Sequence, residues 1–234
     1  MGLKTISGGL ICAGRGKRFR EAGVAAPKAM IALSGRPLLD WAVRQLWTAG
    51  IDRMTVIFNS ENAPTCRRYL EQTFTQMHFT IICRDTATSF ESFQAVLAAA
   101  PAGHVLITTV DAVYAPGRVA EFLRFARRLA PGSMALGVTG FIDDEKPLFA
   151  TLAPDNRIVC IGAGKSRFVT SGIYWLPAAF ARLGRGKHFA ALRQYLAYLI
   201  GEGSPCFGFD MGKSIDIDRP ADLAAAKAFV GTFS

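Results

Sequence analysis

Four short and almost wholly apolar runs, alternating with amphipathic periods, restrict the fold of this chain more than any other feature of its sequence. The apolar runs lie at residues 8–13, 54–58, 79–83 and 105–110. Helical spacing of apolar residues appears in residues 38–49, 63–74, 90–100 and 118–129. Strands of this kind that alternate with helices predict a parallel sheet covered on both faces. We therefore expect an α/β fold that binds its ligands at the carboxyl ends of the strands.

The C-terminal part of the chain has a different pattern, which predicts a small mixed-sheet insertion. Its expected elements are short strands near residues 148–152, 157–161 and 168–176, a turn at Asp155-Asn156, a helix at 188–200, a strand toward Asp210 and an alanine-rich final helix. The chain has 234 residues, half of them apolar, and no internal repeat or low-complexity linker. A chain of this size buries about 70% or more of its unfolded surface. We expect residues 1–234 to form a single domain.

The first apolar run opens into a glycine turn surrounded by positive charge. Gly14 and Gly16 lie in this turn. The cations around it are Arg15, Lys17, Arg18, Arg20 and Lys28. Backbone N–H groups exposed by glycine, together with nearby Lys and Arg, form a cradle for phosphate groups. The turn therefore predicts that the chain binds a polyphosphate.

Two common phosphate-binding loops do not fit this turn. The dinucleotide fingerprint requires a third glycine where Phe19 stands, and an acidic residue on a second strand that is not found at the right distance. The Walker loop requires glycine in place of Ile11 and a hydroxyl in place of Arg18. The sequence therefore departs from each of these two motifs at two positions.

The formal net charge of +9 admits nucleic acid or an acidic membrane as a partner, but a pocket for phosphorylated ligands produces the same balance. No aromatic RNA-binding motif accompanies the basic residues, and the cluster Arg124, Arg127 and Arg128 fits the solvated face of a helix. The first apolar run leads into a basic segment rather than a cleavage site, and no run is long enough to span a bilayer. We expect neither nucleic acid nor membrane as a partner.

The cysteines point to a reduced compartment. They are odd in number and widely spaced, at positions 12, 66, 83, 160 and 206. Four lie in apolar stretches, where a free cysteine behaves as a small hydrophobe, and none forms a C-x-x-C pair or a zinc-type cluster with histidine. These features predict a cytoplasmic protein.

Three aspartates are candidates for metal binding. Asp111 directly follows the run 105–110, where a buried charge is costly unless it is compensated by a metal ion or used to cap the next turn. Asp216 and Asp218 flank one apolar residue, so an extended backbone would direct both carboxylates to the same side. Asp218 is alternatively the N-cap of the final helix, because Asp shortly before proline is a common helix start.

The chain resembles the nucleotidyltransferases, which join a nucleoside triphosphate (NTP) to a phosphorylated partner and release pyrophosphate. The resemblance is carried by A-G-x-G-x-R-F at residues 13–19, by Pro27-Lys28 and by D-I-D-x-P-x-D-L at residues 216–223. It is closest to sugar-phosphate nucleotidyltransferases and to enzymes related to molybdenum cofactor guanylyltransferase. It implies a Rossmann-like α/β/α sandwich with a mostly parallel central sheet, in which the mixed-sheet insertion at about 140–176 lines the acceptor side of the pocket.

The resemblance also implies roles for particular residues. The residues expected to act in catalysis are Arg18 and Lys28; those expected to bind the nucleotide are Ala13, Gly14, Gly16 and Ser89. Asp111, together with Asp216 or Asp218, would bind Mg²⁺. Lys165 and Gly172 would lie on the acceptor side, although Gly164 replaces the glutamate that sugar-specific members carry before this lysine. For Ser89 the alternative is that Ser or Thr in residues 86–92 caps the helix that follows.

The function implied is magnesium-dependent transfer of a nucleoside monophosphate from an NTP to a phosphorylated acceptor, with a sugar 1-phosphate as the first choice. The alternatives are transfer of GMP to molybdopterin, transfer of CMP to choline phosphate, and a nucleotide-binding relative without turnover. A glycosyltransferase would need Asp-x-Asp after the central strand, where residues 111–113 read Asp-Ala-Val. The sequence leaves the base and the oligomeric state open, and it allows a homo-oligomer.

Overall fold

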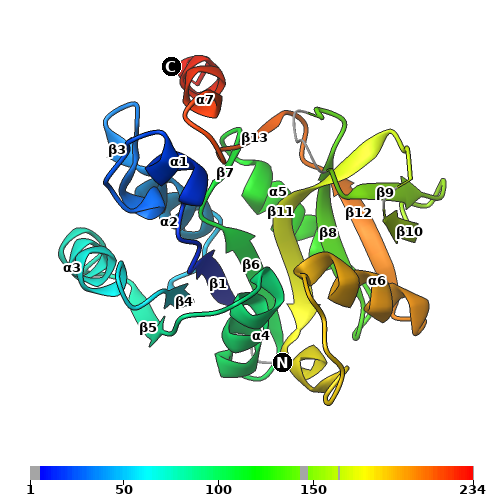
Figure 1. The fold of residues 1–234 in the computed structure, drawn as a ribbon. Coiled ribbons are helices and arrows are strands. Elements are labelled where there is room, and N and C mark those ends of the chain that lie inside the picture. The colour runs from blue at the N-terminus through cyan, green and yellow to red at the C-terminus, as the bar shows by residue number, and fades with distance from the viewer. Residues whose placement is uncertain (1–5, 143–146, 163, 234) are drawn as a thin grey trace.

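A computed structural model describes residues 6–142, 147–162 and 164–233 of the chain and contains a central sheet of nine strands within these ranges (Figure 1). Seven strands follow the order β10-β9-β11-β6-β1-β4-β5, and β8 joins β11 to β12. The strands are β1 (Ser7–Cys12), β4 (Arg53–Phe58), β5 (His78–Cys83), β6 (His104–Thr109), β8 (Met134–Thr139), β9 (Phe149–Leu152), β10 (Ile158–Gly162), β11 (Phe168–Pro177) and β12 (Cys206–Asp210).

The four long apolar runs of the sequence form the parallel part of this sheet, as predicted. Strand β1 pairs in parallel with β4 and β6, and β4 pairs in parallel with β5. Each strand begins and ends within about two residues of its expected bounds. The carboxyl ends of β1 and β6 therefore lie side by side, and this edge of the sheet receives the glycine turn and Asp111.

Helices cover both faces of the sheet. The helices are α1 (Lys17–Glu21), α2 (Leu38–Thr48), α3 (Ala63–Thr73), α4 (Ser89–Ala99), α5 (Arg118–Ala126), α6 (Leu192–Gly201) and α7 (Asp222–Gly231), with 3-10 turns η1 (Lys28–Met30) and η2 (Ala178–Arg182). One apolar cluster joins α2, α3, α5 and α7 to one face, and another joins α4 and α6 to the other. Neighbouring strand residues alternate between them: Leu106 lies in the first and Ile107 in the second. The Rossmann-like sandwich is confirmed.

The expected mixed-sheet part is also present, and its strands β10 and β12 approach each other. Strand β11 pairs antiparallel with β6, β8 and β9, whereas β12 pairs in parallel with β8. An isolated bridge between Arg157 and Phe207, and a hydrogen bond from Gly208 N to Asn156 O of 2.8 Å, connect the start of β10 with β12. The expected turn at Asp155-Asn156 is confirmed, with Asn156 at a φ of 65°.

Two of the longer elements differ from the sequence prediction. Strand β8 was not expected, because Gly137 interrupts its apolar run. Glycine is required there, since a Cβ would lie 2.3 Å from Ile173 Cγ2. Helix α6 begins at Leu192 rather than at residue 188. The residues before it end in an extended Ala191, and Leu192 N donates to Ser89 Oγ at 3.2 Å, which satisfies an N–H group at the start of the helix.

Short elements complete the functional edge of the sheet. Strands β2 (Ala32–Leu33) and β3 (Arg36–Pro37) form a small hairpin. Strand β7 (Ala112–Tyr114) pairs antiparallel with β13 (Ser214–Asp216), which places Asp216 opposite Ala112. This pairing brings the end of the chain beside Asp111. Among the helices in the described ranges, none is long and apolar enough to cross a bilayer.

The close packing of β1 against α4 and β6 makes a testable prediction at Gly9. A Cβ at this position would lie 2.6 Å from Val96 Cγ1 and 2.9 Å from Ile107 Cγ1. Gly9→Ala should therefore lower the free energy of unfolding by about 1–3 kcal/mol, the usual cost of overpacking a core. Gly162→Ala is the matched control, because nothing lies within 4 Å of its Cβ position. Urea unfolding that gave equal midpoints for the two variants would contradict this packing.

Candidate active site

A large cavity lies at the carboxyl ends of β1 and β6. Its volume is about 700 Å³, and its wall includes the segments 11–18 and 86–89 together with Lys28, Asp111 and Asp218. The glycine turn and two of the three candidate aspartates thus face one space, although they are far apart in the sequence. Every residue expected to contact the nucleotide or to act in catalysis lines this cavity: Ala13, Gly14, Gly16, Arg18, Lys28 and Ser89.

The glycine turn has a defined backbone. Gly16 has a φ of 61°, in the left-handed region that favours glycine, and a Cβ there would lie 3.0 Å from Lys28 Cβ. The buried side chain of Phe19 anchors the short helix α1 that follows. Asn59, which follows β4 and is almost fully buried, donates from Nδ2 to Ala13 O at 3.1 Å. Asn59 was missed in the sequence, because nothing in its local pattern shows that the end of β4 lies beside the turn.

Lys28 is the centre of the charge arrangement. Its Nζ donates to Asp111 Oδ2 at 2.5 Å and to Asp218 Oδ1 at 2.7 Å. Burial favours the neutral amine, but the neighbouring charges of Asp111, Asp218 and Asp216 outweigh burial and raise the pKa of Lys28 above its ordinary value. The side chain therefore carries a fixed positive charge in the wall of the large cavity.

The three aspartates come together as a cluster. Asp111, Asp216 and Asp218 each offer a carboxylate oxygen, and these oxygens all lie within 4.8 Å of one another. Ile217 lies between the two C-terminal aspartates; its side chain is buried, and its N–H donates to Asp111 O at 3.1 Å. The expectation that Asp216 and Asp218 point to the same side is confirmed.

The alternative in which Asp218 caps the final helix is wrong. Helix α7 begins at Asp222, four residues later. Asp222 Oδ2 instead accepts hydrogen bonds from Asp218 N at 2.8 Å and Arg219 N at 2.7 Å. The side chain of Asp222 thus fixes the backbone turn, and the Asp218 carboxylate remains directed toward Lys28 and Arg18.

The charges of the cluster are not equivalent. Burial would raise the pKa of Asp111, but the charge and the hydrogen bond of Lys28 outweigh burial and lower it. The pKa of Asp216 is raised well above its usual range by desolvation and by the negative charges of Asp111 and Asp218. The oxygens of the three carboxyl groups lie close together, and such a set of oxygen donors suits a hard divalent cation.

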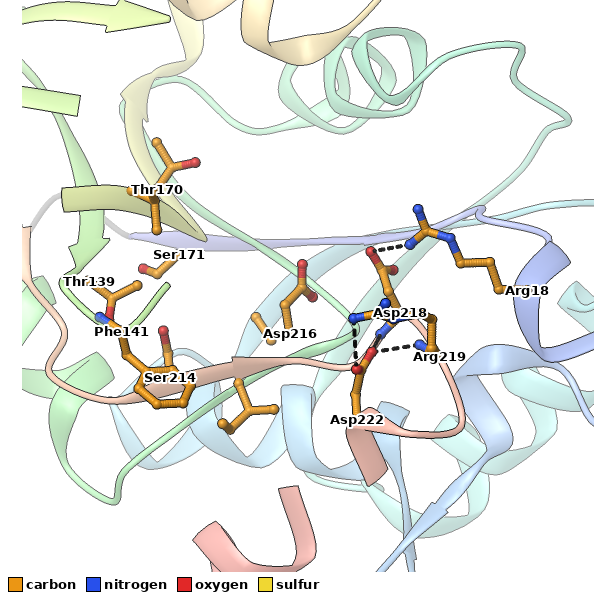
Figure 2. A pocket seen from close by; sticks show the side chains of 13 residues that line it. Arg18, Thr139, Phe141, Thr170, Ser171, Ser214, Asp216, Asp218, Arg219 and Asp222 are labelled. Carbon is orange, nitrogen blue, oxygen red and sulfur yellow. Dashed lines mark hydrogen bonds and ion pairs between the residues drawn. The ribbon is translucent and has the colours of Figure 1, made fainter. Parts of the chain in front are cut away.

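A small cavity adjoins the large one. Figure 2 shows its hydroxyl side chains, Thr139, Thr170, Ser171 and Ser214, on one side and charged side chains, among them Arg18, Asp218 and Arg219, on the other, with Asp216 between them. Its volume is about 60 Å³. Arg18 and Asp218 line both cavities, so the two spaces meet at this pair of side chains.

The two residues expected on the acceptor side, Gly172 and Lys165, differ in how they lie relative to the small cavity. Gly172, at a φ of 79°, is the neighbour of Ser171 in β11, and a Cβ there would lie 2.7 Å from Thr109 Oγ1. Lys165 is exposed in the connection between β10 and β11 and lines neither cavity. Within the stretch 140–176, Phe141 and residues 169–171 line the small cavity, while residues 143–146 and 163 lie outside the described residues.

Ser89 has a structural partner as well as a place in the cavity wall. Its Oγ accepts the hydrogen bond from Leu192 N, and the residue that caps α4 is Thr88, whose Oγ1 accepts from Glu91 N at 3.1 Å. The expected cap in this segment is therefore present at Thr88. Thr139, Ser214 and Arg219 of the small cavity were missed, because their approach depends on how β8, β11 and β13 meet in space.

The burial of Lys28 predicts its effect on stability. Lys28→Met removes the ammonium and leaves Asp111 and Asp218 without this partner, so the free energy of unfolding should fall by about 2–3 kcal/mol. Lys17→Met is the matched control, because Lys17 is 85% exposed and lies 3.6 Å from Glu21 in a solvent-exposed pair. Chemical denaturation of both variants measures the difference. A stability for Lys28→Met equal to that of the control would contradict a structural role for the pair.

The fold and the site together define a class of protein. A mostly parallel sheet whose carboxyl edge carries a basic glycine turn and a carboxylate cluster in one cavity is typical of Rossmann-like proteins that bind phosphorylated nucleotides. The chain belongs to the family described as the MobA-like NTP transferase domain, which matches residues 8–195. It is therefore a nucleotidyltransferase, and the family resemblance seen in the sequence is confirmed.

Solved structures similar to this chain share its whole fold. They include the inositol-1-phosphate CTP transferase from T. maritima, at a TM-score of 0.84 and 19% identity, covering 99% of this chain and 97% of the other. A putative glucose-1-phosphate thymidylyltransferase from Bacillus anthracis, in complex with a sucrose, has a TM-score of 0.84 and 16% identity, covering 96% and 94%. UDP-glucose pyrophosphorylase from Acinetobacter baumanii has a TM-score of 0.79 and 18% identity, covering 96% and 93%. No match was found among curated proteins.

Proposed function

We propose that this nucleotidyltransferase transfers a nucleoside monophosphate from an NTP to a small phosphorylated acceptor in a magnesium-dependent reaction, with a sugar 1-phosphate as the acceptor class and pyrophosphate as the product. The observation that carries the proposal is the convergence of the glycine turn, Lys28, Asp111 and Asp218 on one cavity. The names of the similar structures include inositol 1-phosphate, glucose 1-phosphate and UDP-glucose, and they support the choice of acceptor. The cytoplasm is the compartment we propose for this reaction.

The donor set of the cluster supports a magnesium site. Mg²⁺ prefers oxygen ligands and is commonly bound by one or two carboxylates together with substrate phosphates. Asp111, Asp216 and Asp218 provide such oxygens at the edge of the cavity that contains the glycine turn. When bound, the ion would neutralise charge on the phosphates and polarise the phosphorus that is attacked.

The residues of the chain would position the triphosphate and balance its charge. The backbone N–H groups around Gly14 and Gly16 would donate hydrogen bonds to phosphate oxygens, because glycine has no side chain that would keep a ligand away from them. Lys28 uses two of its three N–H donors on carboxylates, and the third can be donated to an oxygen of the α-phosphate. Arg18 would bind the departing pyrophosphate through its planar fork. Positioning and charge stabilisation of this kind account for most of the catalysis in phosphoryl transfer.

The direct test is pyrophosphate release. The protein would be incubated with Mg²⁺, each of the four common NTPs and a panel of acceptors that includes glucose 1-phosphate, inositol 1-phosphate and choline phosphate. We expect release with at least one pair, and its loss when EDTA removes the metal. Absence of release with every pair by a demonstrably folded protein would contradict the proposal. Tight NTP binding without turnover, unaffected by Asp111→Ala, would instead identify a nucleotide-binding relative.

A substitution at Asp111 tests the cluster itself. Asp111→Asn keeps the size of the side chain and removes its charge, so kcat should fall by at least about 10²-fold, the scale on which a charge-stabilising group contributes. Asp155→Asn makes the same change at an exposed turn that lines neither cavity and should leave kcat within about twofold. Initial rates of pyrophosphate release at saturating substrate measure both. Unchanged turnover in Asp111→Asn would exclude Asp111 from the reaction.

A further inference from the structure

We propose that Ser171 selects the acceptor, because its hydroxyl forms a hydrogen bond with a hydroxyl group of the phosphorylated acceptor. This hydrogen bond restricts the enzyme to small, hydroxylated phosphates. This inference rests on the proposed function and adds a residue that determines specificity. It is carried by three observations: the backbone bulge that places Ser171, the lack of a partner for its hydroxyl, and the size and lining of the small cavity.

An irregularity in β11 places Ser171 in the wall of the small cavity. Thr170 pairs with Val138 of β8 and Tyr174 pairs with Leu136, so four steps along β11 correspond to two along β8. Bulges of this kind redirect side chains and are common beside active sites. Gly172 adopts the left-handed conformation that the bulge requires. Regular pairing would direct the side chains of this segment differently.

Buried hydrogen bonds hold the bulge in place. Tyr114 donates its hydroxyl to Ser171 O at 2.5 Å, and Thr108 donates to Gly172 O at 3.2 Å. Tyr114 N in turn donates to Gln45 Oε1 of α2 at 2.8 Å. The backbone at Ser171 is therefore tied to β6, β7 and α2. These hydrogen bonds fix the backbone of Ser171 and do not involve its hydroxyl group.

The Ser171 hydroxyl is buried and has no hydrogen-bond partner within the described ranges of the chain. The residue is 9% exposed and its Oγ faces Gly137 of β8, which has no side chain that could serve as a partner. Leaving a buried hydroxyl unpaired costs free energy, because the group has lost its hydrogen bonds to water. By contrast, the Thr139 hydroxyl both donates to Gly212 O at 2.7 Å and accepts from Phe141 N at 3.0 Å.

A ligand hydroxyl that enters the small cavity would supply the missing partner. Serine can rotate about its Cα–Cβ bond between staggered positions to meet such a group. A site built to bind a hydroxyl rejects analogues that lack one, because its own polar group is then left unpaired. The Ser171 hydroxyl would thus be one of the groups that distinguish a sugar or polyol phosphate from choline phosphate.

The size of the small cavity favours the same class of acceptor. Its volume of about 60 Å³ accommodates about four to six water molecules at 10–15 Å³ each. That space fits the hydroxylated edge of a small molecule. Thr170 and Ser214 add two more hydroxyl groups to the wall, and Arg18 and Arg219 add positive charge suited to the phosphate of the acceptor.

The test compares acceptors and variants together. Hydroxylated probes are glucose 1-phosphate, inositol 1-phosphate and glycerol 3-phosphate; probes without a hydroxyl on carbon are choline phosphate and ethyl phosphate. Wild-type protein should use at least one hydroxylated probe with a kcat/KM at least about tenfold above either of the others. Ser171→Ala should lower that kcat/KM about five- to tenfold, the worth of one neutral hydrogen bond, and leave the rate with hydroxyl-free phosphates and the KM for the NTP within about twofold.

Two further measurements separate this role from a structural one. Ser171→Ala should have a melting temperature equal to or above that of the wild type, since it removes an unpaired buried hydroxyl. Ser133→Ala is the matched control, because Ser133 is also buried and lines neither cavity, and it should not change the preference for hydroxylated acceptors.

Several results would overturn the inference while leaving the proposed function intact. These are a preference of the wild type for choline phosphate, no change in preference on Ser171→Ala, or an equal loss with both kinds of acceptor. Failure of the proposed function is distinguishable, because no acceptor would then release pyrophosphate from any NTP. In that event calorimetric titration of inositol 1-phosphate decides the role of Ser171: tighter binding to wild type than to Ser171→Ala supports it, and equal or undetectable binding to both rejects it.

Discussion

The ion pairs of Lys28 with Asp111 and Asp218 join three distant parts of the chain, and the geometry of the site depends on them. The partners are 83 and 190 residues from Lys28 in the sequence. Removing charges from water is expensive, and apolar residues of similar volume often replace a buried ion pair without loss of stability. Stability alone therefore does not explain why charged residues occupy this position. A site that must hold phosphates and a cation gives a reason for them, which is why the proposed function accounts for the arrangement better than packing does.

The parallel sheet supplies the geometry for these pairs. The carboxyl ends of β1 and β6 are adjacent because the two strands are paired in register, and the glycine turn and Asp111 each follow one of these ends. The β7–β13 pairing then adds Asp216 and Asp218 from the end of the chain. Local preferences of three segments thus create a charge cluster that none of them could form alone.

The sequence was informative where local chemistry determines the structure and uninformative where it does not. Apolar runs and glycine–cation chemistry are local, so the parallel strands, the turn at Gly14 and the alignment of Asp216 with Asp218 were predictable. Strand β8 was missed because Gly137 interrupts its apolar run. The need for glycine there comes from Ile173 of β11, which leaves no room for a Cβ at position 137. The sequence indicated Gly172 and not its neighbour Ser171, because the bulge that places Ser171 depends on the pairing of two strands. Lys165, carried over from relatives, lines neither cavity, and its role at the acceptor remains a prediction.

The two cations at the junction of the cavities differ in how firmly they are held. Lys28 is buried between its carboxylates, whereas Arg18 lies 3.1 Å from Asp218 with both side chains more than 40% exposed. Exposed ion pairs contribute at most about 1 kcal/mol, so a phosphate can take the Arg18 guanidinium from Asp218 at little cost. Under the proposed function, Lys28 would then be the fixed charge at the reacting phosphorus, and Arg18 the adjustable one. Arg18 lines both cavities. Under the proposed function, its charge would therefore reduce the repulsion between the phosphates of the NTP and of the acceptor where they must approach.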